Sequence, residues 1–272
     1  MAASTPVRST APHGPLRAVA RQADYWLIVY HRTWKGSVIS SFVTPALYVI
    51  AMGVLLGRYV DSGPARLGGA PSYLAFVAPG LLAAQSMQTA FGEVTYPVLS
   101  RLKWDKAYYS MSASPLSVGD IALAHLAYAV ARIALGSLVF VLVLAPFGVF
   151  AGVTGAVLAL LAQLLVGLAF ATPLYAFSAG LTNESAFALV FRLGMIPLFL
   201  FSGAFFPITN LAGWMQVLAR ITPLWHGVDL TRMLALEQVD AGAAAVHVAY
   251  LLALVVAGYA WALRRLGRRM VA

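Results

Sequence analysis

Residues 152–180 read GVTGAVLALLAQLLVGLAFATPLYAFSAG and contain no charged side chain. A helix of about 20 apolar residues crosses the hydrocarbon core of a bilayer, so this stretch is long enough to span a membrane. Five further segments have the same character, at 37–57, 73–93, 120–146, 186–206 and 243–263. None of the six alternates strictly between polar and apolar residues, which argues against a transmembrane β-barrel. The sequence therefore predicts an all-α integral membrane protein with six transmembrane helices.

The composition agrees with this prediction. Of 272 residues, 61% are hydrophobic and 10% are charged, and there is no cysteine. Soluble domains average about 45–50% apolar and about 25% charged residues, so this chain cannot cover its apolar side chains with charge. A soluble globular protein, a disordered chain and a disulfide scaffold are excluded. Six spans also leave no room for a second, soluble catalytic domain.

The net charge of +9 is concentrated on one expected side of the membrane. Basic residues gather before the first span, in the loop 94–119 and at the C-terminus: Arg8, Arg17, Arg21, Arg32, Lys35, Arg101, Lys103, Lys106, Arg264, Arg265, Arg268 and Arg269. The alternate loops carry only Arg58, Arg66, Arg220 and Arg232. Because Lys and Arg mark cytoplasmic loops, both termini are expected in the cytoplasm. The charge marks that face, and no nucleic-acid partner is expected.

The first 36 residues divide into two parts. Residues 1–14 are polar and contain Pro, Ser and Thr, which is typical of a disordered tail. In residues 15–36, apolar side chains that include Trp26 fall on one side of a helix, and basic side chains fall mostly on the other. This pattern predicts an amphipathic helix in the membrane interface, or one that packs on another protein surface.

Several motifs for chemistry are absent from the sequence. It has no G-x-x-x-x-G-K-[ST] phosphate-binding loop, no H-E-x-x-H metal motif and no G-x-S-x-G nucleophile turn. The acids nearest the bilayer, Glu93, Asp120 and Glu184, fall at expected cytoplasmic ends of spans. A membrane enzyme acting on a lipid-linked substrate would need acids or metal ligands inside the bilayer, and a secondary transporter tends to use mid-membrane carboxylates. Both remain as alternatives, and no cofactor or metal is expected on this chain.

Two arginines lie within expected spans. Arg192 is close to the cytoplasmic start of its span, so its side chain can snorkel to the interface. Arg132 lies deeper, in the span 120–146. An arginine near a helix centre costs about 2.5–3.5 kcal/mol on insertion scales, so it usually faces protein or water. We expect Arg132 to pair with a neighbouring helix, to face a cavity or to touch a substrate.

The expected cytoplasmic loop contains an amphipathic stretch at 96–112. Aromatic and apolar side chains alternate there with charged ones, in the order Leu99, Arg101, Leu102, Lys103, Trp104, Asp105, Lys106, Tyr108, Tyr109 and Met111. The stretch breaks at Ser114-Pro115, and residues 117–120 are suited to open the next helix. A short helix of this kind either docks another protein or rests on the lipid headgroups.

The stretch 199–237 interrupts the pattern of spans. Pro207 ends an apolar run, and an amphipathic piece follows it as far as Pro223. About 14 residues are too few to cross a bilayer. The piece therefore predicts a re-entrant or external interfacial helix, whose irregular backbone needs hydrogen bonds from protein or water.

Two motifs of this sequence resemble those of type-2 ABC exporter permeases, in particular the branch of nodulation lipo-oligosaccharide and drug exporters, and they follow each other along the chain in the order expected for that family. The C-terminal motif comprises Phe201, Ser202, Gly203, Phe205, Phe206, Pro207 and Leu211, followed by Trp214, Pro223, Leu224, His226 and Arg232. The cytoplasmic motif comprises Met111, Ala113, Ser114, Pro115, Leu116 and Ser117, followed by Asp120. The resemblance covers most of the chain after about residue 20. One departure is Ala212-Gly213, where that family usually has a proline.

The resemblance implies one transmembrane domain over 15–272, which forms half of a dimer in the bacterial cytoplasmic membrane. Each copy would dock a separate ATPase subunit that holds ATP and Mg, so the chain itself would not be an enzyme. The N-terminal helix would be the interfacial connecting helix, and residues 96–112 would be the coupling helix. The expected ATPase contacts are Arg101, Lys103, Trp104, Asp105, Tyr108, Tyr109 and Met111.

The resemblance also implies a path for the substrate between the two protomers. Residues 207–223 would form an external re-entrant hairpin supported by Pro207, Pro223, His226 and Arg232. The expected path and exit residues are Phe199, Phe201, Phe205, Phe206, Trp214 and Arg132. An apolar path suits an amphiphile such as a lipo-oligosaccharide, a drug or a lipid. Such a role would place the chain among efflux and antibiotic-resistance proteins, surrounded by membrane lipids.

Overall fold

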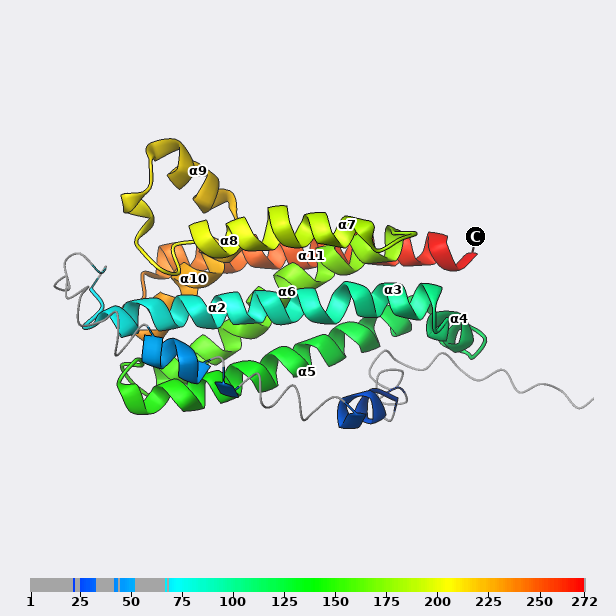
Figure 1. Ribbon diagram of the computed structural model, residues 1–272, viewed down its shortest axis with the longest axis horizontal. Coiled ribbons are helices and arrows are strands. Elements are labelled where there is room, and N and C mark those ends of the chain that lie inside the picture. Colours follow the sequence, from blue (N-terminus) through cyan, green and yellow to red (C-terminus); the bar gives the residue numbers. More distant parts are fainter. Residues whose placement is uncertain are drawn as a thin grey trace, which may run out of the picture.

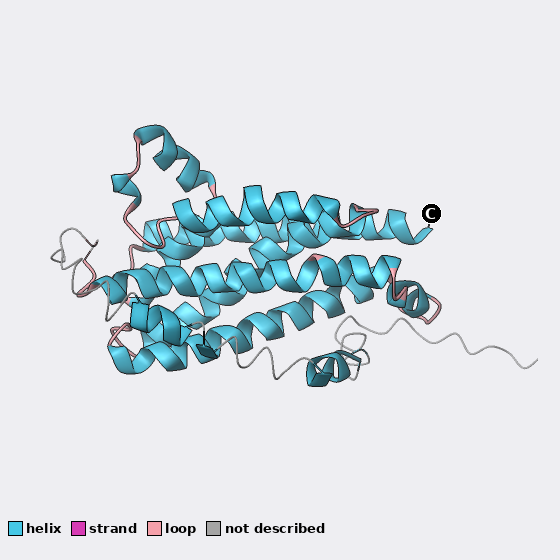
Figure 2. Ribbon diagram, viewed as in Figure 1, coloured by secondary structure: helices cyan, strands magenta, loops and turns pink. Residues whose placement is uncertain are grey.

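The computed structural model describes residues 22, 25–32, 42–43, 45–51, 67 and 69–271. Within these residues the regular structure is helical and no strand occurs (Figure 2). The expected tail at 1–14 and most of the expected first span at 37–57 lie outside the described residues.

Among the residues that the structure describes, four helices are long and apolar enough to cross a membrane. They are α2 (Tyr73–Val94) with its continuation α3 (Tyr96–Lys103), α5 (Val118–Leu144) with the turn η3 (Ala145–Phe147), α6 (Val153–Gly180) and α11 (Ala241–Val271). They correspond to the expected spans 73–93, 120–146, 152–180 and 243–263. Figure 1 shows them side by side, with the α2–α3 unit and α5 extending to the end of the bundle where α4 (Ala107–Ser112) lies.

The expected fifth span is shorter than the sequence predicts. It comprises α7 (Ser185–Leu189), a π-helical stretch η4 (Val190–Met195) and α8 (Ile196–Phe201), which together form an apolar helix from Ser185 to Phe201. The helix stops before 206 because the backbone bends, and Gly203 takes a φ of +80° that favours glycine. Residues 202–206 therefore form an irregular segment at the end of the bundle opposite α4.

Helix α6 is at the centre of the bundle, packed against α2, α5, α11 and α10 (Pro223–Ala235). Small residues allow the close approach of these helices. A Cβ added at Gly258 of α11 would lie 2.5 Å from Thr172 Oγ1 and 2.7 Å from Pro173 N, both on α6. At this crossing, α11 can therefore approach α6 only because position 258 has no side chain.

A buried polar network joins four helices inside this apolar core. Ser86 Oγ of α2 donates to Gln163 Oε1 of α6 at 3.0 Å and lies 3.2 Å from Ser137 Oγ of α5. Gln163 Nε2 donates to Thr231 Oγ1 of α10, also at 3.0 Å. All four side chains are buried. Hydrogen bonding among them removes the cost of polar groups in an apolar interior and fixes α10 against three long helices.

The segment 207–235 is more deeply embedded than a plain external loop. After the turn η5 (Ile208–Asn210), helix α9 (Gly213–Ile221) lies outside the bundle (Figure 1). Thr222 then caps α10, which has Pro223 in its first turn and packs on α2, α6 and α11. The expected 207–223 hairpin is thus only the first arm, and the second arm continues to Ala235.

Candidate functional site

The expected coupling segment 96–112 is two helices and not one. Helix α3 prolongs α2 and ends at Lys103, because the Trp104 and Asp105 amides both donate to the Ser100 carbonyl at 2.9 Å. Ser100 Oγ donates to Asp105 Oδ2 at 2.7 Å, and Lys106 takes a left-handed φ of +52°. Within the segment 96–112, therefore, only α4 forms a separate short helix.

The expected ATPase-contact residues divide into exposed and buried groups. Lys103, Trp104, Asp105 and Tyr109 are exposed, Met111 is partly buried, and Arg101 and Tyr108 are buried. Lys103 Nζ lies 3.1 Å from Glu184 Oε2, which joins α3 to the turn between α6 and α7. The amide of Glu184 itself and then Lys103 lower the pKa of this exposed carboxyl. Arg101 and Tyr108 face the protein interior, so only their exposed neighbours are accessible to a partner protein.

Tyr108 is the centre of a buried hydrogen-bond chain, here called the Tyr108 cluster, which comprises Tyr108, His125, Tyr175 and the carbonyl of Glu93. Tyr175 OH donates to Tyr108 OH at 3.1 Å, and Tyr108 OH is hydrogen-bonded to His125 Nδ1. His125 Nε2 lies 2.9 Å from the Glu93 carbonyl. Because a carbonyl only accepts, Nε2 carries the proton and Nδ1 accepts from Tyr108.

Every group of the Tyr108 cluster is satisfied with all three side chains neutral. The tyrosines and His125 are fully buried, and burial raises the pKa of Tyr108, which keeps its hydroxyl a donor. The cluster connects α4 to α5, α6 and the end of α2. A displacement of α4 therefore acts on three long helices through directed hydrogen bonds.

The described part of the N-terminal helix covers this cluster. The Trp26 ring is buried, stacks on Tyr128 at 4.6 Å and lies 4.8 Å from the His125 ring. The Arg101 guanidinium lies over the same indole at 4.5 Å. Leu27 and Ile28 are exposed, although Leu27 also lines a cavity against α5. This helix therefore buries Trp26 against the protein and leaves other apolar side chains uncovered.

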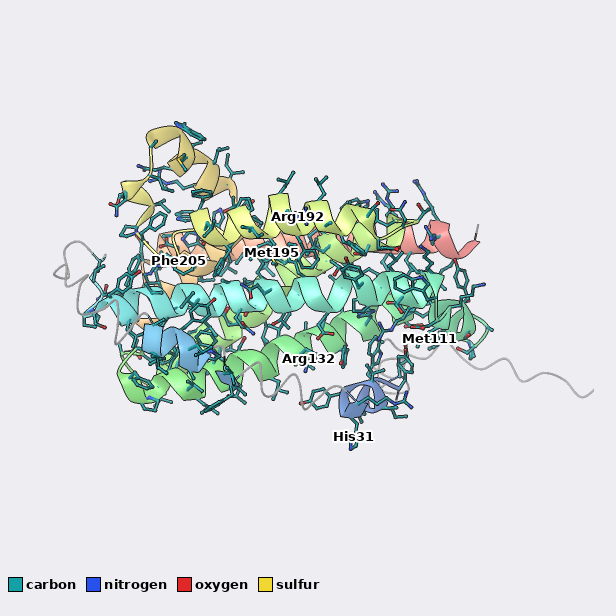
Figure 3. All side chains as sticks on the ribbon, in the orientation of Figure 1. His31, Met111, Arg132, Arg192, Met195 and Phe205 are labelled. Carbon is teal, nitrogen blue, oxygen red and sulfur yellow. The ribbon has the colours of Figure 1, made fainter. Side chains whose placement is uncertain are left out.

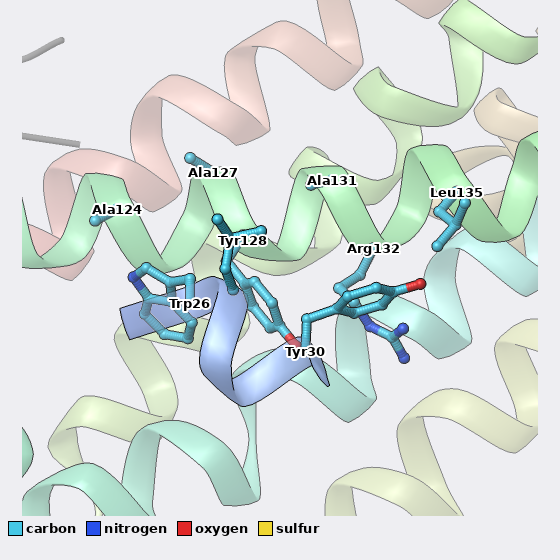
Figure 4. A pocket seen from close by; sticks show the side chains of 9 residues that line it. Trp26, Tyr30, Ala124, Ala127, Tyr128, Ala131, Arg132 and Leu135 are labelled. Atoms are coloured by element: carbon cyan, nitrogen blue, oxygen red, sulfur yellow. The ribbon is translucent and has the colours of Figure 1, made fainter. Parts of the chain in front are cut away.

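Arg132 has both a partner helix and a cavity. Its Nε lies 2.9 Å from Glu93 Oε1 of α2, and its guanidinium is 5.5 Å from the Tyr30 ring. The side chain lines a cavity of about 530 Å³ between the N-terminal helix and α5, together with Trp26, Tyr30 and Tyr128 (Figure 4). Arg192 is exposed on the helix 185–201, away from Arg132 (Figure 3).

The expected exit residues do not share one surface. Phe201 and Trp214 line a second cavity of about 560 Å³, formed by the helix 185–201 and α9. Phe199 and Phe205 instead pack edge to face at 4.9 Å, partly buried against the core. Phe206 is partly buried and, like Arg132, is outside the lining of this cavity.

Arg232 of α10 holds the irregular segment 202–206. Its Nη2 donates to the Gly203 carbonyl at 2.8 Å, and its Nε donates to the Phe76 carbonyl at 3.2 Å. The guanidinium lies 3.9 Å over the Phe76 ring. Tyr73 OH also donates to the Phe205 carbonyl at 3.1 Å. The donors to Gly203 and Phe205 satisfy carbonyls of the irregular segment that follows α8, and the donor to Phe76 ties that segment to α2.

Three polar features were not identified from the sequence. His125 is a single residue within a span, and only the fold brings it to Tyr108 and Tyr175. Glu93 was placed at the end of a span, whereas α2 and α3 continue past it and set it beside Arg132. Asp229 lies in the stretch 199–237 that interrupts the pattern of spans, and α10 carries it to His247, at 3.1 Å. For the contact of Asp229 with His247, the only signal in the local sequence is that Asp229 follows His226 by three positions, which puts both on one face of a helix.

Comparison with known proteins adds a family assignment to this geometry. Residues 24–236 match the sequence profile described as "ABC-2 type transporter". "Nodulation protein J" of Sinorhizobium fredii is 29% identical over 90% of this chain and 94% of its own length. The protein of the same name from Rhizobium meliloti is 30% identical over 82% and 84% of the two chains, and that from Rhizobium leguminosarum bv. trifolii is 32% identical over 78% and 81%.

Proposed function

Because this chain belongs to the ABC-2 type transporter family, we propose that it is the transmembrane permease subunit of an ATP-driven exporter. The observation that carries this proposal is the family match over 24–236 in a multi-pass membrane chain that has no phosphate-binding loop. ATP and Mg would be held by a separate ATPase subunit. Within the described ranges, no group of three or more His, Cys, Asp or Glu could hold a metal ion.

The ATPase docks at the end formed by α3 and α4. Trp104 is 52% exposed there, and Lys103, Asp105 and Tyr109 surround it with polar and charged groups. An exposed aromatic ring among charged neighbours is typical of a protein interface. The orientation predicted from the basic residues, with both termini in the cytoplasm, would put this surface on the side where ATP is available.

The Tyr108 cluster transmits the movement of the ATPase into the bundle. Alternating access needs two arrangements whose populations ATP changes. Tyr108 and Arg101 contribute to this transmission from buried positions behind the docking surface. Tyr108 connects α4 to α5 and α6 by hydrogen bonds, and the Arg101 guanidinium packs against Trp26 of the connecting helix. Their role is to position helices, and neither touches the ATPase.

A second copy of the chain covers the apolar surface beside the α8–α9 cavity. Leu193 is 69% exposed and Trp214 is 67% exposed on this surface. The homodimer encloses a path for an amphiphile along spans one, two and five, with Phe201 and Trp214 at its exit. A lipo-oligosaccharide, a drug or a lipid-like molecule is the substrate class, and the domain comprises 15–272.

The experiment that tests this function is reconstitution in lipid vesicles. The chain is purified alone and together with the ATPase encoded by a neighbouring gene, and ATP hydrolysis is measured across a panel of amphiphiles. We expect no hydrolysis by the chain alone and stimulated hydrolysis by the complex. Substantial hydrolysis by the chain alone would contradict the proposal. Transport that needs a proton gradient but no ATP would favour a secondary transporter, and turnover of a lipid-linked substrate would favour a membrane enzyme.

A further inference from the structure

The cavity between the N-terminal helix and α5 lies apart from the proposed exit. It has a volume of about 530 Å³, which is within the usual range for sites that hold a small molecule. The proposed exit is lined by the helix 185–201 and α9 instead. In Figure 1 the N-terminal helix with α5 and the helix α9 lie on opposite sides of the bundle. The cavity is therefore a separate site.

The walls of this cavity are mainly small and aromatic side chains. The N-terminal helix and α5 contribute them, namely Trp26, Tyr30, Ala124, Ala127, Tyr128 and Ala131 (Figure 4). Within the part of the chain that the structure describes, Arg132 is the only charged residue of the lining. An apolar cavity with a single cation suits an amphiphile that has an anionic head.

The cavity lies at the level where lipid headgroups meet the hydrocarbon core. A span of about 20 residues counted back from Phe147, where the apolar helix 118–147 ends, reaches Tyr128 in the cavity wall. Leu27 is 62% exposed and Ala131 is exposed, so the cavity is open to its surroundings along this rim. In the orientation predicted from the basic residues, those surroundings are the inner leaflet of the membrane.

Arg132 can hold an anion without giving up its ion pair. Glu93 Oε1 lies 2.9 Å from its Nε, and both side chains are partly exposed, at 16% for Arg132 and 18% for Glu93. A guanidinium presents several N–H donors in a planar fork, which is why arginine is common where phosphate is bound. Arg132 can therefore donate to a phosphate oxygen in addition to its protein partners, while Glu93 positions it from α2.

A second arginine adds positive charge behind the cavity wall. The Arg101 guanidinium lies 4.5 Å over the Trp26 ring, and its side chain is buried. Its Nε has no hydrogen-bond partner, and among the described residues no carboxylate forms an ion pair with it. The carboxylate of Asp120, one turn before Ala124, accepts from Ser117 instead. Because charges act more strongly in an apolar environment than in water, this charge favours an anion in the cavity and disfavours the ammonium of a zwitterionic headgroup.

We propose that this cavity binds one anionic glycerophospholipid of the inner leaflet, with the phosphate at Arg132 and the apolar part against the alanine and aromatic walls. The bound lipid fills the space between the N-terminal helix and α5. Trp26 of this wall also lies 4.8 Å from the His125 ring of the Tyr108 cluster. The lipid therefore adds contacts that hold the N-terminal helix in place over the Tyr108 cluster.

The test is native mass spectrometry of the purified chain in detergent, titrated with phosphatidylglycerol, phosphatidylcholine or phosphatidylethanolamine of the same acyl chains. We expect one phosphatidylglycerol to bind about tenfold more tightly than either zwitterionic lipid. Arg132→Gln should lower the affinity for phosphatidylglycerol by about tenfold and remove this preference, because a charge-assisted hydrogen bond is lost. Arg192 provides a matched control, since it is exposed on the helix 185–201 away from the cavity (Figure 3), and Arg192→Gln should leave the affinity unchanged.

Ala131→Phe tests the cavity without removing the ion pair. Ala131 is exposed at the rim, so a larger side chain occupies the cavity and does not enter the packed core. Binding of phosphatidylglycerol should fall by about tenfold although Arg132 and Glu93 are both present. This variant keeps the proposal testable if Arg132→Gln does not fold. Glycerol 3-phosphate, which has the anion but no acyl chain, should not displace the lipid.

Three results would overturn the proposal. The first is equal affinity of the unaltered chain for the three lipids, which needs no variant to fold. The second is unchanged binding of phosphatidylglycerol by Ala131→Phe. The third is displacement of the lipid by an equal concentration of glycerol 3-phosphate, which would make the cavity a site for a soluble anion. The titration requires neither ATP nor an ATPase, so its outcome is independent of whether the chain proves to be an exporter subunit.

Discussion

Replacing Tyr108 by phenylalanine removes one hydroxyl from the Tyr108 cluster and leaves two other groups without partners. His125 Nδ1 loses its donor, and the Tyr175 hydroxyl loses its acceptor. Both are fully buried, and a buried polar group left unsatisfied costs about 1–3 kcal/mol. The free energy of unfolding should therefore fall by about 2–6 kcal/mol.

Tyr175→Phe is the comparison that makes this prediction sharp. It removes only the first hydrogen bond of the chain, and Tyr108 still donates to His125. The expected loss is the net value of one hydrogen bond, about 0.5–1.5 kcal/mol. Tyr109 lies beside Tyr108 on α4, and its exposed hydroxyl donates to the Arg269 carbonyl at 3.3 Å. Tyr109→Phe should therefore change the free energy of unfolding by less than about 0.5 kcal/mol.

Two measurements test this prediction. The free energy of unfolding is measured by chemical unfolding of the purified chain in detergent micelles. Transport is measured separately, with the folded chain and the ATPase. Tyr108→Phe should let the complex hydrolyse ATP while transport per ATP falls, because α4 still docks but no longer pulls on α5 and α6. Equal losses of stability in Tyr108→Phe and Tyr175→Phe would refute the directed chain. Unchanged transport per ATP would refute its role in coupling.

Three further predictions concern other parts of the molecule. Gly258→Ala forces a Cβ against Thr172 and should cost about 1–3 kcal/mol of unfolding free energy, whereas Gly267→Ala on the same helix meets nothing within 4 Å and should be neutral in the same unfolding assay. Trp104→Ala should weaken ATPase binding about tenfold in a pull-down titration without a change in stability, and unaltered affinity would remove this residue from the interface. Arg232→Lys cannot hold two carbonyls and an aromatic face at once, so thermal unfolding should show a loss of about 1–3 kcal/mol; an unchanged midpoint would mean that the irregular segment does not depend on it.

Hydropathy located the long helices because an apolar run is a property of the sequence itself. The same measure could not show where those helices continue outside the bilayer. Residues 96–103 are amphipathic, so the extension of α2 into α3 looked like part of a separate loop helix. Likewise the fifth helix ends at Phe201 for a reason that hydropathy does not contain, namely a turn at Gly203 whose carbonyl is held by α10.

The candidate site was predicted less completely, because an amphipathic pattern shows that a helix has two faces but does not show what covers each. Trp104 and Tyr108 have similar chemistry and are four positions apart. Trp104 is exposed in the turn after α3, whereas Tyr108 is enclosed by His125 and Tyr175. The partners of Tyr108 come from distant helices, so only the tertiary structure could separate a surface residue from a buried one.

The length of the helices explains why an ion pair is tolerated between α2 and α5. The unit Tyr73–Lys103 has 31 residues and is about 46 Å long, whereas the hydrocarbon core is about 30 Å thick. About 15 Å must therefore protrude, and the basic residues place that excess at the end with α3 and α4. A span of about 20 residues counted from Tyr73 reaches Glu93, and one counted back from Phe147 reaches Tyr128. Glu93 and Arg132 thus pair near the interface beside an aromatic belt, and the Tyr108 cluster runs from that level to Tyr108 in the protruding part, where an ATPase docked as proposed would act on it without deforming helices within the lipid.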